Sequence, residues 1–362
     1  MQNKNYLGID TSNYKTSVAI VDETGALIFE KSKLLAVDKG DKGLRQSLAF
    51  FKHSNILPDF FKEAFEKVDP ASIKGIAYSS RPRRVEGSYM PVFLAGENIA
   101  KSLSYALGVP IMQFSHQEGH IKSALSSSDY PDIDKFLCFH LSGGTSEFLL
   151  CERISDGYKT EIVGGSLDIS IGQLLDRVGV KAGFQFPAGS YLDELAFKKL
   201  CSEDSKAQVI ADKNCEKNGC DAEFDTEFDT KKYKSKVKLN DGYFNLSGIE
   251  TAYLRRLDKG DTIDEIAGEL FLEIETLLLK ASAELSDKYD IKDVLWVGGV
   301  ASSNTIRERI KGIETTEEFS GNNGLKVPHI IFGDKGLSGD NAVGIARLGL
   351  DFFENNIANE IK

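Results

Sequence analysis

Hydrophobic and polar positions alternate in short runs near the N-terminus and then change to a longer, helical period. The apolar runs 6–12 and 16–22 flank the short turn Asn13–Lys15, which predicts a β-hairpin. A third strand-like run covers 26–34. The pattern then predicts further elements in this order: a helix over 43–68, a strand over 74–79, a helix over 91–107, a strand over 110–114, and a helix from residue 116 with Ser115 as its N-cap.

The hairpin pattern returns in the middle of the chain. Residues 136–142 and 145–151 form a second predicted hairpin across Gly143-Gly144, and a further strand-like run, KTEIVGG, follows. The segments GIDTS…TSVAIV and FHLSGG-TSEFLL resemble each other, and each begins a βββα unit. We interpret this as an internal duplication, which predicts two similar lobes with a cleft between them.

The last part of the chain is mostly helical, and it follows a polar segment. Residues 201–240 are rich in Asp, Glu, Lys, Asn and Ser without a sustained period, so we expect an insertion outside the core. The elements predicted after it are a helix over 261–289, a strand over 293–297, the turn Gly298-Gly299, a helix from about Ser303, a strand over 329–332, and a final helix over 341–353.

These elements suggest a division into two domains. We expect an N-terminal lobe over residues 1–115 and a C-terminal lobe over 116–350. The second lobe would contain a metal-binding helix at 116–128 and the insertion near 201–240. The final helix is placed so that it can pack back on the N-terminal lobe.

Composition narrows the class of protein. A length of 362 residues with 41% apolar and 27% charged positions suits two ordinary globular domains. The net charge of -11 disfavours non-specific nucleic-acid binding over the whole surface, although a local basic patch stays open. No apolar run approaches the roughly 20 residues that a membrane span needs, and no signal peptide is visible.

Cysteine usage points to a location. Five cysteines without framework spacing favour a reducing compartment, so we expect a cytoplasmic protein without a membrane partner. Cys215 and Cys220 could bind a metal, but no second pair lies nearby, so plain surface thiols are favoured.

Three glycine-rich or hydroxyl-rich loops could hold phosphate. The segment 294–310 reads strand, Gly298-Gly299, helix, in which glycine lets a backbone approach a ligand and the helix start offers N–H groups. The hairpin turns 10–16 and 142–145 carry matching small and hydroxyl residues: Thr11, Ser12, Thr16, Ser142, Gly143, Gly144 and Thr145. The alternative is ordinary tight hairpins. Together the three loops predict a phosphate-binding cleft in an α/β, two-lobed actin/hexokinase/Hsp70-like ATPase fold, which is a duplicated RNase H-like architecture.

His116 and His120 form a candidate metal site. Their i, i+4 spacing puts both imidazoles on one helix face, as two metal ligands require. The alternative is one core and one surface histidine. Asp340, at a loop–helix junction, is the best candidate for a third ligand, and two His with one carboxylate suit one divalent Fe or Zn ion.

A short basic loop stands out in this acidic chain. The run Arg81-Pro82-Arg83-Arg84 directly follows a predicted strand. It could meet a phosphate or a carboxylate. The alternative is a solvated surface loop whose charges are paired.

These pieces together resemble the TsaD (Gcp, "O-sialoglycoprotein endopeptidase") family from about residue 5 to 350, with 201–240 aligning poorly. HQEGHI, beginning at His116, is the most specific match and resembles the metal motif of the family. The other similar segments are LSGGTS (141–146), SLDISIGQLLDRVG (166–179), FPAGSYLDELA (186–196), FNLSGIET (244–251), VGGVASSNTIR (297–307) and SGDNAVGIARLG (338–349).

The resemblance implies a function and a set of site residues. Family members transfer a threonylcarbamoyl group from threonylcarbamoyl-adenylate to an adenosine beside the tRNA anticodon. The resemblance implies His116, His120 and Asp340 as metal ligands. It also implies a nucleotide ligand (ATP, AMP or threonylcarbamoyl-AMP), and a TsaB-like partner subunit is a further expectation. The implied contacts to the adenylate are His140, Leu141, Ser142, Gly143, Gly144, Asp176 and Gly189.

The chain departs from the family pattern at several of these positions. The first loop, ETSCDET in the family, reads Asp10-Thr11-Ser12-Asn13-Tyr14-Lys15-Thr16 here, so two acids fall on Tyr14 and Lys15. The family's GPGL loop falls on the basic run at 81–84, the Asn expected after the GGV turn falls on Ser303, and PGGP becomes PAGS. We take Asp10 and Lys15 as candidate catalytic residues, and we expect Lys15 to contact a bound phosphate.

The expected activity is therefore a TsaD-like transfer of a threonylcarbamoyl or carbamoyl group. The alternatives are a small-molecule carbamoyl transferase and a non-catalytic nucleotide-binding regulatory subunit. A peptidase is disfavoured because the HxExH spacing around Glu118 is not the HExxH spacing that puts a general base beside zinc.

Overall fold

The protein, a computed structural model, is described for residues 4–12, 14–36, 44–128, 133–200, 235–311, 326–335 and 342–360. The chain forms two compact units. The first unit comprises residues 1–134, 151–160 and 332–362, and the second comprises 135–150 and 161–331. Most of the predicted insertion and the candidate ligand Asp340 lie outside the described residues.

The first unit is built on a five-stranded sheet with strand order β3-β2-β1-β4-β5. The predicted hairpin is confirmed, because β1 and β2 pair antiparallel, whereas β1 with β4 and β4 with β5 pair parallel. The strands are β1 (Asn5–Thr11), β2 (Lys15–Asp22), β3 (Leu27–Leu34), β4 (Ile73–Arg81) and β5 (Ile111–Ser115).

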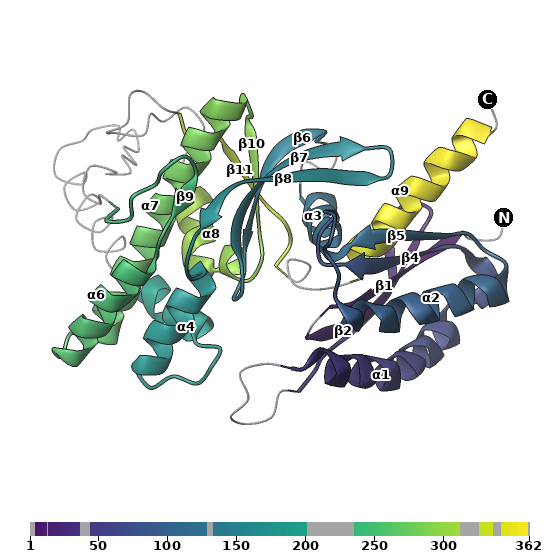
Figure 1. The fold of residues 1–362 in the computed structure, drawn as a ribbon, viewed down its shortest axis with the longest axis horizontal. Helices are drawn as coiled ribbons and strands as arrows, with labels where there is room; N and C mark the ends of the chain where they lie inside the picture. The colour runs from purple at the N-terminus through teal and green to yellow at the C-terminus, as the bar shows by residue number, and fades with distance from the viewer. Residues whose placement is uncertain are drawn as a thin grey trace, which may run out of the picture. The chain divides into compact units, whose positions relative to one another are not determined.

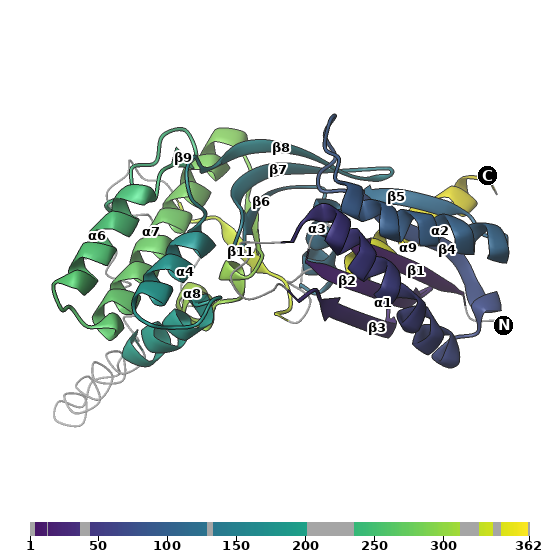
Figure 2. The same ribbon diagram turned by 60° about the horizontal axis from the view of Figure 1, so that its bottom comes forward.

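Both faces of this sheet are covered by helices (Figures 1 and 2). Leu7 and Ile9 of β1 pack in a core with α1 (Gln46–Lys67) and α2 (Leu94–Leu107). Tyr6 points to the opposite face and packs against α9 (Val343–Glu360). This alternation follows from the two-residue period of side chains along a strand. The one-turn helices η1 (Pro70–Ser72) and η2 (Pro91–Phe93) precede β4 and α2.

Helix α3 (His116–Ser126) begins where the sequence predicted. Ser115 caps it in a capping box: its side chain accepts a hydrogen bond from the Glu118 N–H, and the Glu118 side chain accepts one from the Ser115 N–H. The helix packs closely on α9, since a Cβ added at Gly344 would lie 1.9 Å from the Gly119 carbonyl oxygen. This contact places α3 in the first compact unit, although we expected the lobe boundary at residue 115.

The second unit is built on a six-stranded sheet with strand order β11-β10-β6-β7-β8-β9. Leaving out β9, this sheet has the order β8-β7-β6-β10-β11, which matches β3-β2-β1-β4-β5 of the first sheet strand by strand. In addition, β10 pairs parallel with β6, as β4 does with β1. The repeated topology agrees with the predicted duplication. The strands are β6 (Lys135–Leu141), β7 (Ser146–Ile154), β8 (Gly157–Ser166), β9 (Tyr243–Phe244), β10 (Asp293–Val297) and β11 (His329–Phe332).

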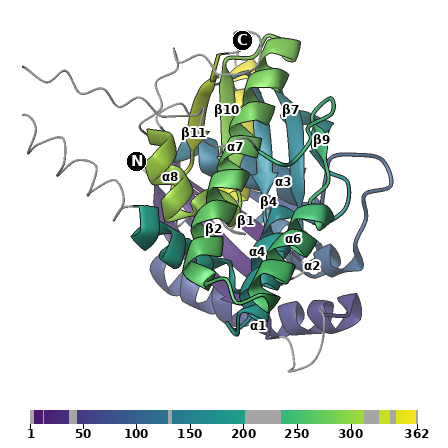
Figure 3. The same cartoon turned by 90° about the vertical axis from the view of Figure 1, so that its left-hand side faces the viewer.

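Helix α7 packs along β10 and β6 of this sheet (Figure 3). Trp296 of β10 is fully buried and stacks with Phe139 of β6. The helices of the unit are α4 (Ile171–Lys181), a helix over 189–200, α6 (Ser247–Asp258), α7 (Ile263–Tyr289), the one-turn η3 (Val300–Ser302) and α8 (Asn304–Lys311). Among the described helices, none combines the length and the apolar character needed to cross a membrane.

Candidate active site: a histidine pair and a set of glycine-bearing turns

The histidine pair lies on the first turn of α3. The Nε2 atoms of His116 and His120 are 3.0 Å apart, and their rings meet edge to face at 78°. His120 is buried and His116 is 18% exposed, so the pair remains reachable from one side. The two Nε2 atoms therefore face each other at hydrogen-bond distance, and the same closeness would let an i, i+4 pair share an ion.

Asp10 stands directly behind this pair. It lies near the end of β1, and its side chain is fully buried. Its Oδ1 atom accepts a hydrogen bond from the Ser79 hydroxyl and lies 3.0 Å from His116 Nδ1. Its Oδ2 atom is buried and has no hydrogen-bond partner. A buried carboxylate oxygen without a partner is unusual and indicates a site that a water or an ion completes.

These residues fit a divalent metal ion of the kind that imidazole binds. Two converging Nε2 atoms and a carboxylate behind one imidazole match the donor chemistry of Fe and Zn sites. Within the described ranges, no three His, Cys, Asp or Glu side chains form a complete cluster, and the candidate third ligand Asp340 falls outside those ranges. The complete ligand set stays a prediction.

Glu118, between the two histidines, is engaged in a structural network. Its side chain is 1% exposed. One carboxylate oxygen accepts hydrogen bonds from Ser115 N and Oγ, and the other accepts from Tyr158 N and from Arg84 Nη1, at distances of 2.7 to 3.1 Å. With four donors around it, this carboxylate cannot also approach a water as a general base, which agrees with the HxExH spacing in disfavouring a peptidase.

Arg84 belongs to the same network. It donates from Nη1 to the Asp156 carbonyl oxygen at 2.8 Å and from Nη2 to the Asp156 carboxylate at 2.5 Å. Burial works against its charge, but its hydrogen bonds and ion pairs with Asp156 and Glu118 outweigh burial and raise the pKa of Arg84. At Arg84 the charge of the basic loop is thus paired, as in the alternative interpretation of a surface loop with paired charges. Arg84 fastens α3 to the turn between β7 and β8.

The first hairpin turn is anchored by a residue that we did not single out, His53 of α1. Its Nε2 atom lies 2.8 Å from the Ser12 carbonyl oxygen, and its Nδ1 atom lies 2.7 Å from Thr16 Oγ1. Since a carbonyl can only accept, Nε2 carries the proton and Nδ1 accepts from the Thr16 hydroxyl. His53 thereby holds both ends of the turn that carries Lys15. Only its place on the apolar face of α1 could have suggested this role.

His53→Ala should destabilise the protein by about 2–4 kcal/mol, because two buried polar groups lose their partner and a cavity opens. Burial lowers the pKa of His53 in the folded state below the unfolded value of about 6.5. Above that pH neither state holds the proton. Below it the unfolded state binds a proton that the folded state resists, so stability falls by up to about 1.4 kcal/mol per pH unit.

Denaturant unfolding at pH 7.5 and 5.5 checks both statements. The wild type should lose more stability between these two pH values than His53→Gln, which has no titratable group at this position. Equal losses in the two proteins would show that His53 does not carry the pH dependence.

In the second unit, the predicted nucleotide loops gather at one edge of the sheet. Because β6 and β10 are parallel neighbours, with His140 opposite Val297, the turns that follow them leave the sheet side by side. A Cβ added at Gly143, Gly144 or Gly299 would meet no atom within 4 Å, so these backbones are open to a ligand.

Other glycines in these turns serve packing. Gly298 has φ +97°, and a Cβ there would lie 2.4 Å from the Leu141 carbonyl oxygen. A Cβ at Gly172 would lie 2.5 Å from Gly143 Cα, which brings the start of α4 onto the β6–β7 turn. Ser170 Oγ donates to the Gly143 carbonyl oxygen at 2.8 Å and fastens the two segments together.

Asp176 and Gly189, two of the implied adenylate contacts, are joined directly. One carboxylate oxygen of Asp176 accepts hydrogen bonds from Ala188 N at 2.7 Å and from Gly189 N at 3.1 Å. Asp176 therefore orders the backbone of the loop that would face the ligand.

Ser303 is held by Asp193, a residue that we did not predict as part of the site. Ser303 Oγ donates to one oxygen of the Asp193 carboxylate at 2.5 Å, and Asn304 N and Thr305 N donate to the same carboxylate at 2.8 and 3.0 Å. The N-terminus of α8 is thus capped by a carboxylate. Asp193 could have been suggested by its place in the FPAGSYLDELA segment, which resembles a segment of the family.

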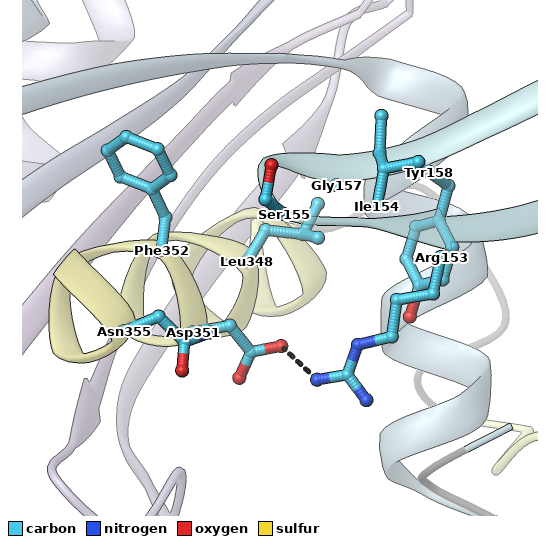
Figure 4. Close-up of a pocket in the computed structure, with 9 residues that line it drawn as sticks. All are labelled: Arg153, Ile154, Ser155, Gly157, Tyr158, Leu348, Asp351, Phe352 and Asn355. Carbon is cyan, nitrogen blue, oxygen red and sulfur yellow. Dashed lines mark ion pairs between the residues drawn. The ribbon is translucent and has the colours of Figure 1, made fainter. Parts of the chain in front are cut away.

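The first unit also contains two pockets, one of which shares Tyr158 with the Glu118 network. A cavity of about 20 Å³ lies between the β7–β8 turn and α9 and is lined by Arg153, Tyr158 and Asp351, among others (Figure 4). It could hold about one water molecule. A wider hollow of about 300 Å³ lies over β3 and α1 and includes Lys31, Lys33 and Glu63. Neither is lined by a predicted site residue.

Comparison with known proteins identifies the family. The chain matches the family TsaD, tRNA N6-adenosine threonylcarbamoyltransferase, over residues 37–328. The protein of that name from Thermotoga neapolitana is 26% identical over 95% of this chain and 93% of its own length, and the one from Persephonella marina is 28% identical over 97% and 90%.

A solved structure shows the same fold. T. kodakarensis HypF superposes with a TM-score of 0.52 and 14% identity, covering 98% of this chain and 48% of that chain. With the duplicated sheet topology, this likeness confirms the predicted actin/hexokinase/Hsp70-like fold class. On the match over residues 37–328, this chain belongs to the TsaD family of acyltransferases.

Proposed function

We propose that this chain transfers a threonylcarbamoyl group from threonylcarbamoyl-adenylate to the adenosine beside the anticodon of a tRNA. Membership of the family supports transfer to tRNA. The observation that supports an adenylate as the donor is the edge of the second sheet, where open glycine backbones lie beside the loop that Asp176 orders. Such an edge, at the carboxyl ends of parallel strands, is a preferred place for a nucleotide.

The chain's own residues would bind and orient the nucleotide. The backbone N–H groups of Gly143 and Gly299 would approach the phosphate, since a Cβ at either residue would meet no described atom within 4 Å. The Gly144 N–H already donates to Ser142 Oγ at 3.3 Å. Asp176 and Gly189 would meet the rest of the adenylate, as the family resemblance implies. Asp193 keeps the start of α8 in place beside these turns.

We further propose that His116 and His120 hold one divalent metal ion, Fe or Zn, with Asp340 as the third ligand. When bound, the ion would supply Lewis-acid polarisation of a phosphate or carbamoyl oxygen. Glu118 takes no part in proton transfer, because its carboxylate is fully used in fastening α3.

The reaction needs no nucleophile from the protein. The N6 amine of the adenosine would attack the carbamoyl carbon, a new C–N bond would form, and the C–O bond to the phosphate would break. AMP would leave, and one amine proton would be released. The protein would contribute by holding both reactants in line.

The decisive experiment is to incubate the purified protein with threonylcarbamoyl-adenylate and an unmodified tRNA, and then to measure the modified nucleoside by mass spectrometry. A parallel reaction would include a TsaB-like partner subunit, which we propose supports the reaction. Modified adenosine beside the anticodon is the expected product. Consumption of the adenylate without tRNA modification would instead favour a small-molecule acceptor. If the adenylate is not consumed and the tRNA is not modified, the result would favour a regulatory subunit.

Lys15 is the residue that most favours an acceptor other than tRNA. It begins β2 next to the half-exposed Tyr14, at the position of a family acid. We propose that its ammonium contacts a bound phosphate, and we expect tRNA modification by the wild type to be slow. Lys15→Glu should weaken binding of AMP by about 1.5–3 kcal/mol, or roughly 10- to 150-fold.

Calorimetry with AMP measures this loss. Lys33→Glu is the matched control, because Lys33 is exposed on β3 opposite Thr16 and the substitution makes the same charge change. Equal affinity in the wild type and Lys15→Glu, together with rapid tRNA modification by the wild type, would show that Lys15 faces solvent and has no role.

A further inference from the structure

We propose that Asp10 is a positioning residue, which fixes the tautomer and the orientation of His116 and thereby strengthens metal binding. This inference rests on the metal site proposed above. It assigns Asp10 a role through another residue, whereas the sequence suggested a catalytic one.

The hydrogen bond between Asp10 and His116 decides the tautomer. An ionised carboxylate can only accept, so the proton of a neutral His116 ring must lie on Nδ1, 3.0 Å from Asp10 Oδ1. The Nε2 atom of His116 then presents its lone pair toward His120. A metal-binding histidine that donates its other ring N–H to a carboxylate is oriented and made more basic by that partner.

Asp10 is itself held in one place. It lies on β1, between β2 and β4 in the sheet, and pairs with Ser17 of β2. The Ser79 hydroxyl of β4 donates to the same Oδ1 atom. The carboxylate is therefore held by strands of the sheet, and it can fix the ring of His116 from outside the helix.

The geometry separates a positioning role from direct ligation. Nδ1 and Nε2 point away from opposite sides of the imidazole ring, so an ion shared by the two Nε2 atoms lies on the far side of His116 from Asp10 Oδ1. The buried Oδ2 atom, which has no hydrogen-bond partner, can accept from a water.

Zinc affinity, measured by competition with a chelator, tests the proposal. We compare the wild type with Asp10→Asn, Ser79→Ala and His120→Ala, after circular dichroism has established that each metal-free variant is folded. Asp10→Asn should bind zinc about 10- to 100-fold more weakly than the wild type. Ser79→Ala, which removes the other hydrogen bond to Oδ1 but leaves the carboxylate, should lose much less.

The ring tautomers supply a second readout that a purely structural role would not move. Long-range nitrogen–proton NMR spectra are tractable with five histidines in the chain. Metal-free wild type should show His116 protonated at Nδ1, and Asp10→Asn should shift it toward the Nε2–H form. If Asp10→Asn does not fold, the wild-type spectrum alone decides, and an Nε2–H ring at His116 overturns the proposal.

Three outcomes are distinguishable. Unchanged zinc affinity in Asp10→Asn overturns the positioning role, and so does a loss as complete as that of His120→Ala, which would make Asp10 a ligand. Equal zinc binding by the wild type and His120→Ala would remove the metal site itself. In that case the tautomer of His116 still tests whether Asp10 orients the ring.

Discussion

Replacing His120 by alanine is expected to remove the bound metal, from about one ion per chain to background. The two Nε2 atoms are 3.0 Å apart, so each would supply one of the two nitrogen donors of the proposed site. Losing one leaves a single imidazole, and an isolated imidazole does not retain an ion through purification. The loss of affinity should exceed the 10- to 100-fold that outer-shell substitutions cause.

Elemental analysis of the purified proteins measures this result. His329→Ala is the matched control, because His329 lies on β11 of the second unit, beside Asp293, and should leave the metal content unchanged. Purification without oxygen keeps iron in the Fe(II) state that suits such a site. Equal metal content in the wild type and His120→Ala would mean that the histidine pair binds no ion.

Much of the fold could be predicted because it depends on local signals. The change from a two-residue to a 3.6-residue period located the strands and the long helices, and β10 and β11 lie at the predicted residues. Ser115 was recognised as an N-cap because its side chain and Glu118 satisfy N–H groups within one turn. The duplicated topology was visible because both hairpins keep the same order of small and apolar residues.

The contacts that build the site could not be predicted, since they join residues far apart in the chain. Asp10 and His116 are 106 positions apart, and Asp193 and Ser303 are 110 apart. Each pair meets because parallel strands or packed helices bring their ends together. The residue types can be recognised in the sequence but these pairings cannot, so neither the Asp10–His116 contact nor the Asp193–Ser303 contact was predicted.

The basic loop shows the same limit. A run of arginines after a strand fits either a phosphate site or a paired surface. Arg84 is paired because Asp156, 72 residues later, lies at the β7–β8 turn that docks on α3. Gly157, which begins β8 directly after that turn, has φ +128°, and a Cβ there would lie 2.3 Å from Glu118, so the close approach itself depends on a glycine.

The second large effect is expected from Gly299→Val, which should weaken AMP binding by about 2–3 kcal/mol, or roughly 30- to 150-fold. The added side chain would occupy the space from which a phosphate reaches the backbone N–H groups of the turn. Gly299 has φ -61° and ψ -36°, and a Cβ there meets no atom within 4 Å. The variant should therefore fold as the wild type does.

The neighbouring glycine supplies the control that separates folding from binding. Gly298 has φ +97°, and a Cβ there would lie 2.4 Å from the Leu141 carbonyl oxygen, so Gly298→Val should cost several kcal/mol of stability. Thermal unfolding should thus distinguish the two variants, whereas calorimetry with AMP should show a large loss for Gly299→Val in a protein of wild-type stability. If Gly299→Val keeps both its stability and its affinity for AMP, the phosphate does not lie over this turn, and the nucleotide must bind elsewhere in the chain.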